Sequence, residues 1–187
     1  MLGTGNVGQM LGTGFVKLRH DVKIGSRNPN SDKLNTWVAN NGTQASAGTF
    51  AETASFDEIA VLATLWEGTE HVIHLARPEN LAGKIVIDTT NPISSIEPGK
   101  PLSLVLGHND SAGEQVQRWL PKSRVVKAFN IVGNTHMLHP EFPNGPPDMS
   151  FAVTMPELRI RYPRFSPHSD GPQLTSAESR APACLNP

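Results

Sequence analysis

A glycine-rich hexapeptide near the start of the chain carries the clearest chemical signal. The run Gly3-Thr4-Gly5-Asn6-Val7-Gly8 matches the pattern G-x-G-x-x-G and precedes apolar residues at helical spacing. In such loops the first glycine allows a tight turn, the second lets the backbone approach a pyrophosphate, and the third lets helix and strand pack closely. The helix that follows offers free N–H groups and the positive end of its dipole to the anion. We predict that these six residues bind a dinucleotide, the alternative being a plain glycine turn.

The residues after the next strand predict which dinucleotide is bound. A site for NAD usually carries Asp or Glu about 20 residues after the loop, where it binds the ribose 2′-hydroxyl. This chain has Gly25-Ser26-Arg27-Asn28 instead. Arg27 can pair with a 2′-phosphate and Ser26 can hydrogen-bond it. The pattern favours NADP over NAD; the alternative for Arg27 is a solvated turn residue, and Lys33 would add charge if its register allows.

Two histidine pairs have the i, i+3 spacing that could place two imidazoles on one helix face. They are His71-x-x-His74 and His136-x-x-His139. A zinc site needs further ligands and an oriented second shell. We therefore predict no metal site and expect His71 and His74 to lie in solvent. His136 and His139 have two possible locations: they are exposed to solvent, or they line the substrate cleft.

Other polar residues have structural interpretations. Asp88 follows an apolar strand-like run, and we expect it to anchor a turn rather than act as a general base. Ser111 and Glu114 have the spacing of a helix capping box. The pattern contains no convincing catalytic dyad, so no residue is assigned a catalytic role.

The elements that must position these residues alternate along the chain. Apolar strand-like runs cover residues 21–25, 59–63, 84–88 and 125–129, with helix-like stretches between them and Ser31 as a candidate helix cap. Such alternation is typical of a parallel sheet with helices on both faces. The sequence therefore predicts an α/β protein with a Rossmann-type doubly wound parallel sheet.

Composition excludes several classes of protein. The 187 residues carry 16 basic and 17 acidic side chains, so no strong field attracts nucleic acid or anionic lipid. No apolar run approaches the ~18 residues of a membrane span. Cys184 is the one cysteine, which rules out an internal disulfide framework. We expect a cytoplasmic protein with a small-molecule substrate and neither a nucleic-acid nor a membrane partner.

The chain divides into two parts of different character. Proline becomes frequent from Pro140 onward, and residues 156–187 show no apolar periodicity. We predict an NAD(P)-binding Rossmann domain over residues 1–150 and an irregular tail over residues 151–187.

Beyond the glycine loop, the chain carries a series of motifs in a fixed order, at residues 3–8, 25–29, 63–69, 88–92 and 125–130. In this order they resemble a known family, the NADP oxidoreductases that use the deazaflavin coenzyme F420, and in particular their bacterial NADPH-dependent reductase-like branch. The resemblance covers roughly residues 1–151, and the related pyrroline-5-carboxylate reductases share the phosphate loop.

The resemblance implies a nicotinamide site at the carboxyl edge of the sheet. Ala63, Thr64, Leu65 and Trp66 would lie beside the nicotinamide ribose. The cleft would be closed by Asn91, Pro92, Ala128, Phe129 and Asn130. For Trp66 and Phe129, packing in the core is the alternative.

The implied reaction is hydride transfer between NADP(H) and coenzyme F420 as second substrate, which requires no protein nucleophile. Relatives suggest a homodimer. An imine or pyrroline-5-carboxylate type reductase remains an alternative, as does a non-catalytic NADP-binding module or an inactive truncated product.

Two departures from the family pattern stand out. Only Met1-Leu2 precede Gly3, so the first strand is truncated, and we hypothesise that Met1 is an internal GTG valine codon. After Phe151 the pattern disappears, while a neighbouring reading frame of residues 168–187 can encode it, which suggests a frameshift near residue 151. We expect the sheet to keep an unpaired interior edge and an uncovered apolar face.

Overall fold

Strands and helices alternate through the part of the chain that the computed structural model describes. These are residues 1–56, 58–94, 99, 101, 103–107, 109–138, 140, 142–143 and 149–153. The elements in chain order are α1 (Asn6–Lys17), β1 (Val22–Gly25), α2 (Asp32–Asn41), η1 (Gly42–Gln44), β2 (Ala45–Gly48), α3 (Phe50–Phe56), β3 (Ile59–Leu62), α4 (Trp66–Ala76), η2 (Pro78–Leu81), β4 (Ile85–Asp88), α5 (Ala112–Trp119), β5 (Arg124–Lys127), η3 (Asn134–His136) and β6 (Ala152–Val153).

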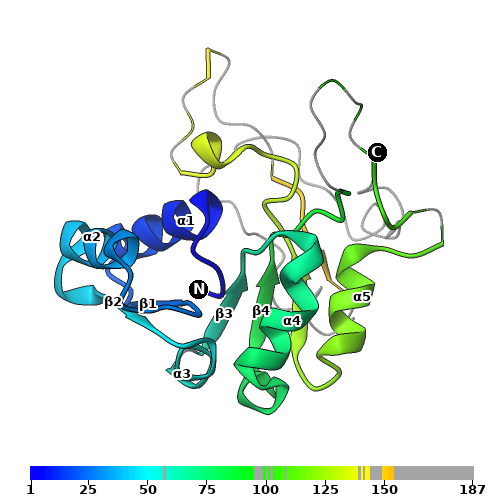
Figure 1. The fold of residues 1–187 in the computed structure, drawn as a ribbon. Coiled ribbons are helices and arrows are strands. Elements are labelled where there is room, and N and C mark those ends of the chain that lie inside the picture. The colour runs from blue at the N-terminus through cyan, green and yellow to red at the C-terminus, as the bar shows by residue number, and fades with distance from the viewer. Residues whose placement is uncertain are drawn as a thin grey trace.

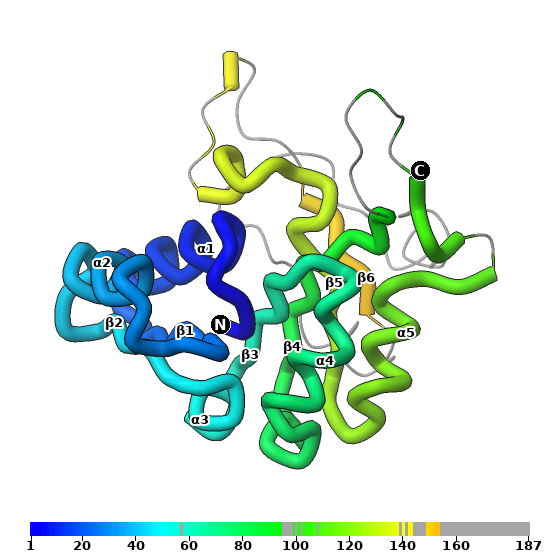
Figure 2. The backbone as a smooth tube through the Cα atoms, in the orientation of Figure 1, coloured from blue at the N-terminus to red at the C-terminus, as the bar shows by residue number. Residues whose placement is uncertain are grey.

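The strands form a doubly wound sheet, as predicted. β1 pairs with β2 in parallel, β3, β4 and β5 pair in parallel, and β6 adds to β5 in the antiparallel direction. Leu2 bridges β1 and β3 in parallel, opposite Gly25 and Leu62, which gives the order β2-β1-Leu2-β3-β4-β5-β6. Figures 1 and 2 show the halves on either side of the N-terminus. The chain reverses its direction of winding at Leu2, and in such sheets ligands bind outside the strand ends at this point.

Only two residues form the first strand, yet they join both halves. The amide of Leu2 donates to the Val61 carbonyl at 2.7 Å, and the Leu2 carbonyl accepts from Ala63 at 2.9 Å. On the other side the Met1 carbonyl accepts from Gly25 at 2.8 Å, and the Met1 amine donates to the Lys23 carbonyl at 2.7 Å.

The interior edge is therefore paired at its carboxyl end and open at its amino end. A cavity of about 670 Å³ begins there, bordered by Met1, Val22 and Ile59, and extends across the sheet face to Val126 and Phe151. Ile59 is 52% exposed at the start of β3 although the rest of that strand is buried. The expected gap thus lies beside the amino ends of β1 and β3.

Helices pack on both faces of the sheet, but on the α1 side the cavity also borders the Val61, Ile87 and Val126 side chains of β3, β4 and β5. The expected uncovered apolar face is therefore covered only in part. On one face α1 and α2 pack with the Leu11, Ile24 and Trp37 side chains in one core cluster. On the other face α3, α4 and α5 bury a second cluster that includes Ile73 and Val116. Figure 1 shows α4 and α5 on the same side of β3 and β4. The strands carry continuous apolar runs because both of their faces are buried.

Several local expectations need adjustment. β5 ends at Lys127 rather than at residue 129, because Phe129 has a positive φ of 64° that a strand does not contain. β2 and α3 were not anticipated, since Ala45–Gly48 contains small residues with no strong strand preference. Ser31 lies at the N-cap of α2 without a side-chain capping bond.

The capping box of α5 is confirmed. Ser111 accepts from the Glu114 amide, and the Glu114 carboxylate accepts from the Ser111 amide. β6 lies within the segment predicted as an irregular tail. The division of the chain at residue 150 stays a prediction, and Cys184 lies outside the described residues.

Candidate functional site

The glycine loop lies between the truncated first strand and α1, at the carboxyl edge of the sheet. Gly3 has a φ of +133°, and a Cβ at this position would lie 2.1 Å from the Ala63 carbonyl oxygen. A Cβ at Gly8 would lie 2.3 Å from the Gly3 oxygen. A Cβ at Gly5 would meet nothing within 4 Å. Two glycines are thus required by packing, whereas Gly5 leaves open space toward solvent.

The first turn of α1 can receive an anion. Gly5 is the N-cap of this helix, and no side chain caps it. Gly5 and Asn6 are exposed, and Thr4 and Val7 are half-buried. The N–H groups of a helix start and its positive dipole end form a site for phosphate. These residues therefore fit a dinucleotide pyrophosphate.

β1 is the neighbour of the short strand that leads into the glycine loop, and the Ser26-Arg27 turn follows β1. Ser26 is held by its amide, which donates to the Gly48 carbonyl at 2.9 Å, and its Oγ accepts from the Asn28 amide at 3.0 Å. The Ser26 hydroxyl keeps its own proton for a further acceptor. Arg27 is exposed and has no ion-pair partner among the described residues. The pair can meet a phosphate that lies beyond the end of β1.

The segment after β3 separates into an exposed residue and an inward-facing one. Leu65 is 77% exposed at the N-cap of α4. Trp66 instead packs on Trp119 of α5 with ring centroids 5.4 Å apart, against the core. Thr64 is fixed through a 2.8 Å hydrogen bond to the Thr69 hydroxyl. This geometry supports the packing alternative for Trp66, and its contact with a cofactor stays a prediction.

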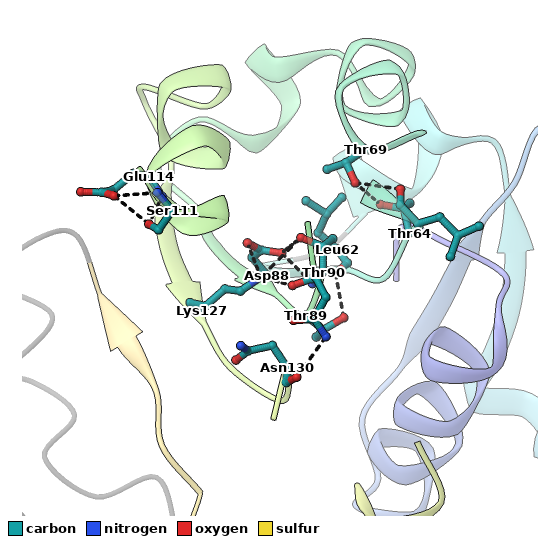
Figure 3. Close-up of polar contacts among 12 residues, drawn as sticks. Leu62, Thr64, Thr69, Asp88, Thr89, Thr90, Ser111, Glu114, Lys127 and Asn130 are labelled. Carbon is teal, nitrogen blue, oxygen red and sulfur yellow. Dashed lines mark hydrogen bonds and ion pairs between the residues drawn. The ribbon is translucent and has the colours of Figure 1, made fainter. Parts of the chain in front are cut away.

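A buried polar network holds the turn after β4 (Figure 3). The amide and hydroxyl of Thr89 both donate to the Leu62 carbonyl at 3.0 Å. The amide and hydroxyl of Thr90 donate to Asp88 Oδ1 at 2.9 and 2.7 Å. Asp88 has no solvent exposure. It anchors the turn, as the sequence predicts.

Lys127 completes this network and was missed by sequence reasoning. Its Nζ donates to Asp88 Oδ2 at 3.0 Å and to the carbonyl of Thr90. Burial lowers the pKa of Lys127, while the charge of Asp88 and the hydrogen bond to it act in the opposite direction. The available signal was a lysine within the apolar run of residues 125–129 and an aspartate at the end of another strand.

The structure brings together the residues predicted to close the cleft. Asn91 Nδ2 donates to the Asn130 carbonyl at 3.0 Å. The amide of Ala128 donates to the Asp88 carbonyl at 3.1 Å. Phe129 packs against the core cluster of α1 and α2, and Pro92 is buried. Asn91 and Asn130 are the half-buried polar residues of this group.

The histidine pairs form no metal site in the part of the chain that the structure describes. No group of three potential ligands occurs among those residues. His71 and His74 are exposed on α4, as expected. The His136 ring lies 5.0 Å from that of Phe142, and His139 lies outside the described residues. Within the same part of the chain, every helix is too short or too polar to cross a membrane.

The arrangement suits an extended two-part ligand. The glycine loop and the Ser26-Arg27 turn lie at one side of the switch point. The ends of β3, β4 and β5 lie at the other, tied together by Thr89 and Asp88. One half can hold phosphates and the other a flat polar ring, and no group in the network is an exposed nucleophile.

Comparisons with known proteins agree with this geometry. Residues 1–92 match the family model of coenzyme F420-dependent NADP oxidoreductases. A crystal structure from Arthrobacter sp. FB24, whose proposed identity is an F420-dependent NADP reductase, has a TM-score of 0.76 and 29% identity over 85% of this chain and 74% of that chain.

A more distant structure shares the fold. The imine reductase of Streptomyces aurantiacus has a TM-score of 0.58 and 16% identity, covering 85% of this chain and 48% of that one. A curated relative, the metalloreductase STEAP3 of Rattus norvegicus, is 32% identical over 133 residues, or 71% of this chain. The chain spans 24% of the length of that relative.

Proposed function

We propose that this chain, which belongs through residues 1–92 to the family of coenzyme F420-dependent NADP oxidoreductases, transfers a hydride between NADP(H) and a deazaflavin-type acceptor. The observation that carries the proposal is the glycine loop at the switch point beside a turn that has Arg27 where NAD sites carry an acid. The acceptor is a small molecule in this proposal.

The adenosine half of the cofactor is assigned to the N-terminal residues. The open space at Gly5 and the uncapped start of α1 support pyrophosphate binding by residues 3–8. Ser26 and Arg27 take the 2′-phosphate, because a guanidinium and a hydroxyl match its oxygens. An acid at the same place would repel that phosphate.

The nicotinamide half is assigned to the ends of the next three strands. The residues that line it follow the strand ends: Ala63, Thr64 and Leu65 after β3, Asn91 and Pro92 after β4, and Ala128, Phe129 and Asn130 after β5. Trp66 supports the first group from behind, through its packing on Trp119. When bound, the nicotinamide supplies or accepts the hydride. The chain holds that ring and the acceptor close and aligned, which is the main protein contribution to such a transfer.

The experiment has a binding arm and a turnover arm. The purified full chain is titrated with NADPH and with NADH while tryptophan fluorescence is followed. NADPH oxidation is then measured with F420, with an imine and with pyrroline-5-carboxylate.

We expect NADPH to bind more tightly than NADH. Of the three acceptors, we expect only F420 to support turnover. Turnover with only the imine or only pyrroline-5-carboxylate would show that the acceptor is an imine-type substrate and not a deazaflavin. Binding without any turnover would identify a cofactor-binding module. Tighter binding of NADH than of NADPH would overturn the cofactor assignment.

A further inference from the structure

We propose that Lys127 is a positioning residue, which fixes the turn after β4 and thereby shapes the nicotinamide side of the cleft without touching the adenosine side. This inference rests on the proposed function. Lys127 is the last residue of β5, and the hydrogen-bond acceptors of its ammonium group all come from the end of β4 or the turn beyond it. The side chain therefore ties two neighbouring strand ends together.

The ammonium group has an acceptor for each of its donors. A lysine carries three N–H donors. Asp88 Oδ2 lies 3.0 Å from Nζ, the Thr90 carbonyl accepts a second bond, and Thr90 Oγ1 lies at 3.4 Å. Two of these acceptors belong to Thr90, so the lysine holds that residue as much as it neutralises Asp88.

The burial of Lys127 and Asp88 suggests that the ion pair does more than fill space, because burying two charges costs desolvation free energy. Lys127 is 9% exposed and Asp88 is fully buried. A buried ion pair adds little net stability, and well-packed apolar residues often do as well or better. The other inward-facing positions of these strands on this face, Val86 and Val125, are apolar. The ion pair therefore has its main effect on the geometry of the turn.

The hydrogen bond from Lys127 to Thr90 directly affects Asn91, one of the proposed nicotinamide residues. The carbonyl of Thr90 belongs to the peptide group that continues into Asn91, so holding this oxygen sets the orientation of that peptide. Asn91 then donates to the Asn130 carbonyl at 3.0 Å. Figure 3 shows Lys127, Thr90 and Asn130 around this one turn. The described contacts of Lys127 include no residue of the glycine loop or of the Ser26-Arg27 turn.

The test separates the two halves of the cofactor. Binding of NADPH is compared with binding of adenosine 2′,5′-bisphosphate, which presents only the adenosine side. The variants are Lys127→Met and the double variant Asp88→Asn with Lys127→Met, and melting temperatures are measured for each. The double variant leaves no unpaired buried charge, so it carries the test if the single variant unfolds.

Lys84 provides a matched control at the opposite end of β4. Its half-buried Nζ donates to the Ala54 carbonyl at 2.6 Å, far from the carboxyl edge. Lys84→Met removes a lysine–carbonyl bond of the same kind. Its effect should be confined to the melting temperature.

We expect the double variant to bind adenosine 2′,5′-bisphosphate as the parent does and to bind NADPH about tenfold more weakly or worse, as for the loss of a charged hydrogen bond. In the turnover assay kcat should fall as well. Unchanged NADPH affinity and kcat in a folded double variant would overturn the inference. Equal weakening of both nucleotides would also overturn it, since that indicates general loss of structure. Failure of the parent to bind either nucleotide would instead refute the proposed function.

Discussion

Gly8 lies directly against the carbonyl oxygen of Gly3, so that a Cβ at position 8 would be 2.3 Å from that oxygen. Side-chain atoms do not approach a backbone oxygen so closely, and α1 can therefore start where it does only if residue 8 is glycine. Gly5, between the two, has no neighbour within 4 Å of such a Cβ. Close packing therefore requires glycine at positions 3 and 8. At position 5 it does not, and we explain that glycine by the close approach of a ligand.

This difference gives the first prediction. Gly8→Ala should lower the free energy of unfolding by about 2 kcal/mol or more, because overpacking forces the backbone to shift. Gly5→Ala should destabilise the chain by only about 1 kcal/mol or less, because alanine is a poorer N-cap than glycine. It should weaken NADPH binding about tenfold or more, since its methyl group occupies the path of the pyrophosphate. Thermal melting and NADPH titration of both variants check this. Full NADPH affinity in Gly5→Ala would contradict the assignment of the loop.

The second prediction concerns the choice of cofactor. Arg27→Asp should weaken NADPH binding about 10- to 100-fold, because it replaces a charge-assisted hydrogen bond with repulsion. NADH affinity should stay the same or rise. Lys122→Asp makes the same charge change at an exposed site before β5, at the other end of the sheet, and should change neither affinity. An equal loss in both variants would point to a general effect of net charge.

The third prediction concerns the open slot beside Met1. An Ile-Val extension joined in front of Met1 would continue the first strand between β1 and β3, into the cavity of about 670 Å³. Each apolar side chain that becomes buried there should add about 1.5 to 3 kcal/mol. That corresponds to a rise in melting temperature of several degrees. A Gly-Ser extension of equal length is the control, and an equal rise with both would contradict strand addition.

The fourth prediction compares two buried threonines. Thr53 Oγ1 is fully buried and has no hydrogen-bond partner among the described residues, whereas Thr69 Oγ1 bonds to Thr64 Oγ1 and the Leu65 carbonyl. Thr53→Val should stabilise the chain by about 1 kcal/mol, and Thr69→Val should destabilise it by about 1 to 3 kcal/mol. Chemical denaturation measures both. A less stable Thr53→Val variant would show that the hydroxyl is satisfied.

Much of the fold could be predicted from the sequence, because it depends on interactions between residues that are close together in the chain. The glycine loop, the apolar runs of β1, β3 and β4, and the Ser111–Glu114 capping box each depend on residues close together in sequence. For the same reason the doubly wound α/β class could be predicted from alternation alone. β2 was missed because its small residues carry little periodic signal, and α3 because its seven residues are too few to show a helical period.

The sequence by itself determined where a dinucleotide loop can form, because only glycine meets the close contacts at positions 3 and 8. The tertiary structure alone decided that Trp66 turns toward Trp119, and that Asp88 and Lys127 meet although they lie 39 positions apart in the sequence. That meeting depends on the register of β4 and β5, in which these two residues lie opposite each other. A long connection joins β4 and β5, so no turn between them fixes their register. The register is set when the apolar residues of both strands pack together on the sheet faces, which requires residues far apart in the sequence.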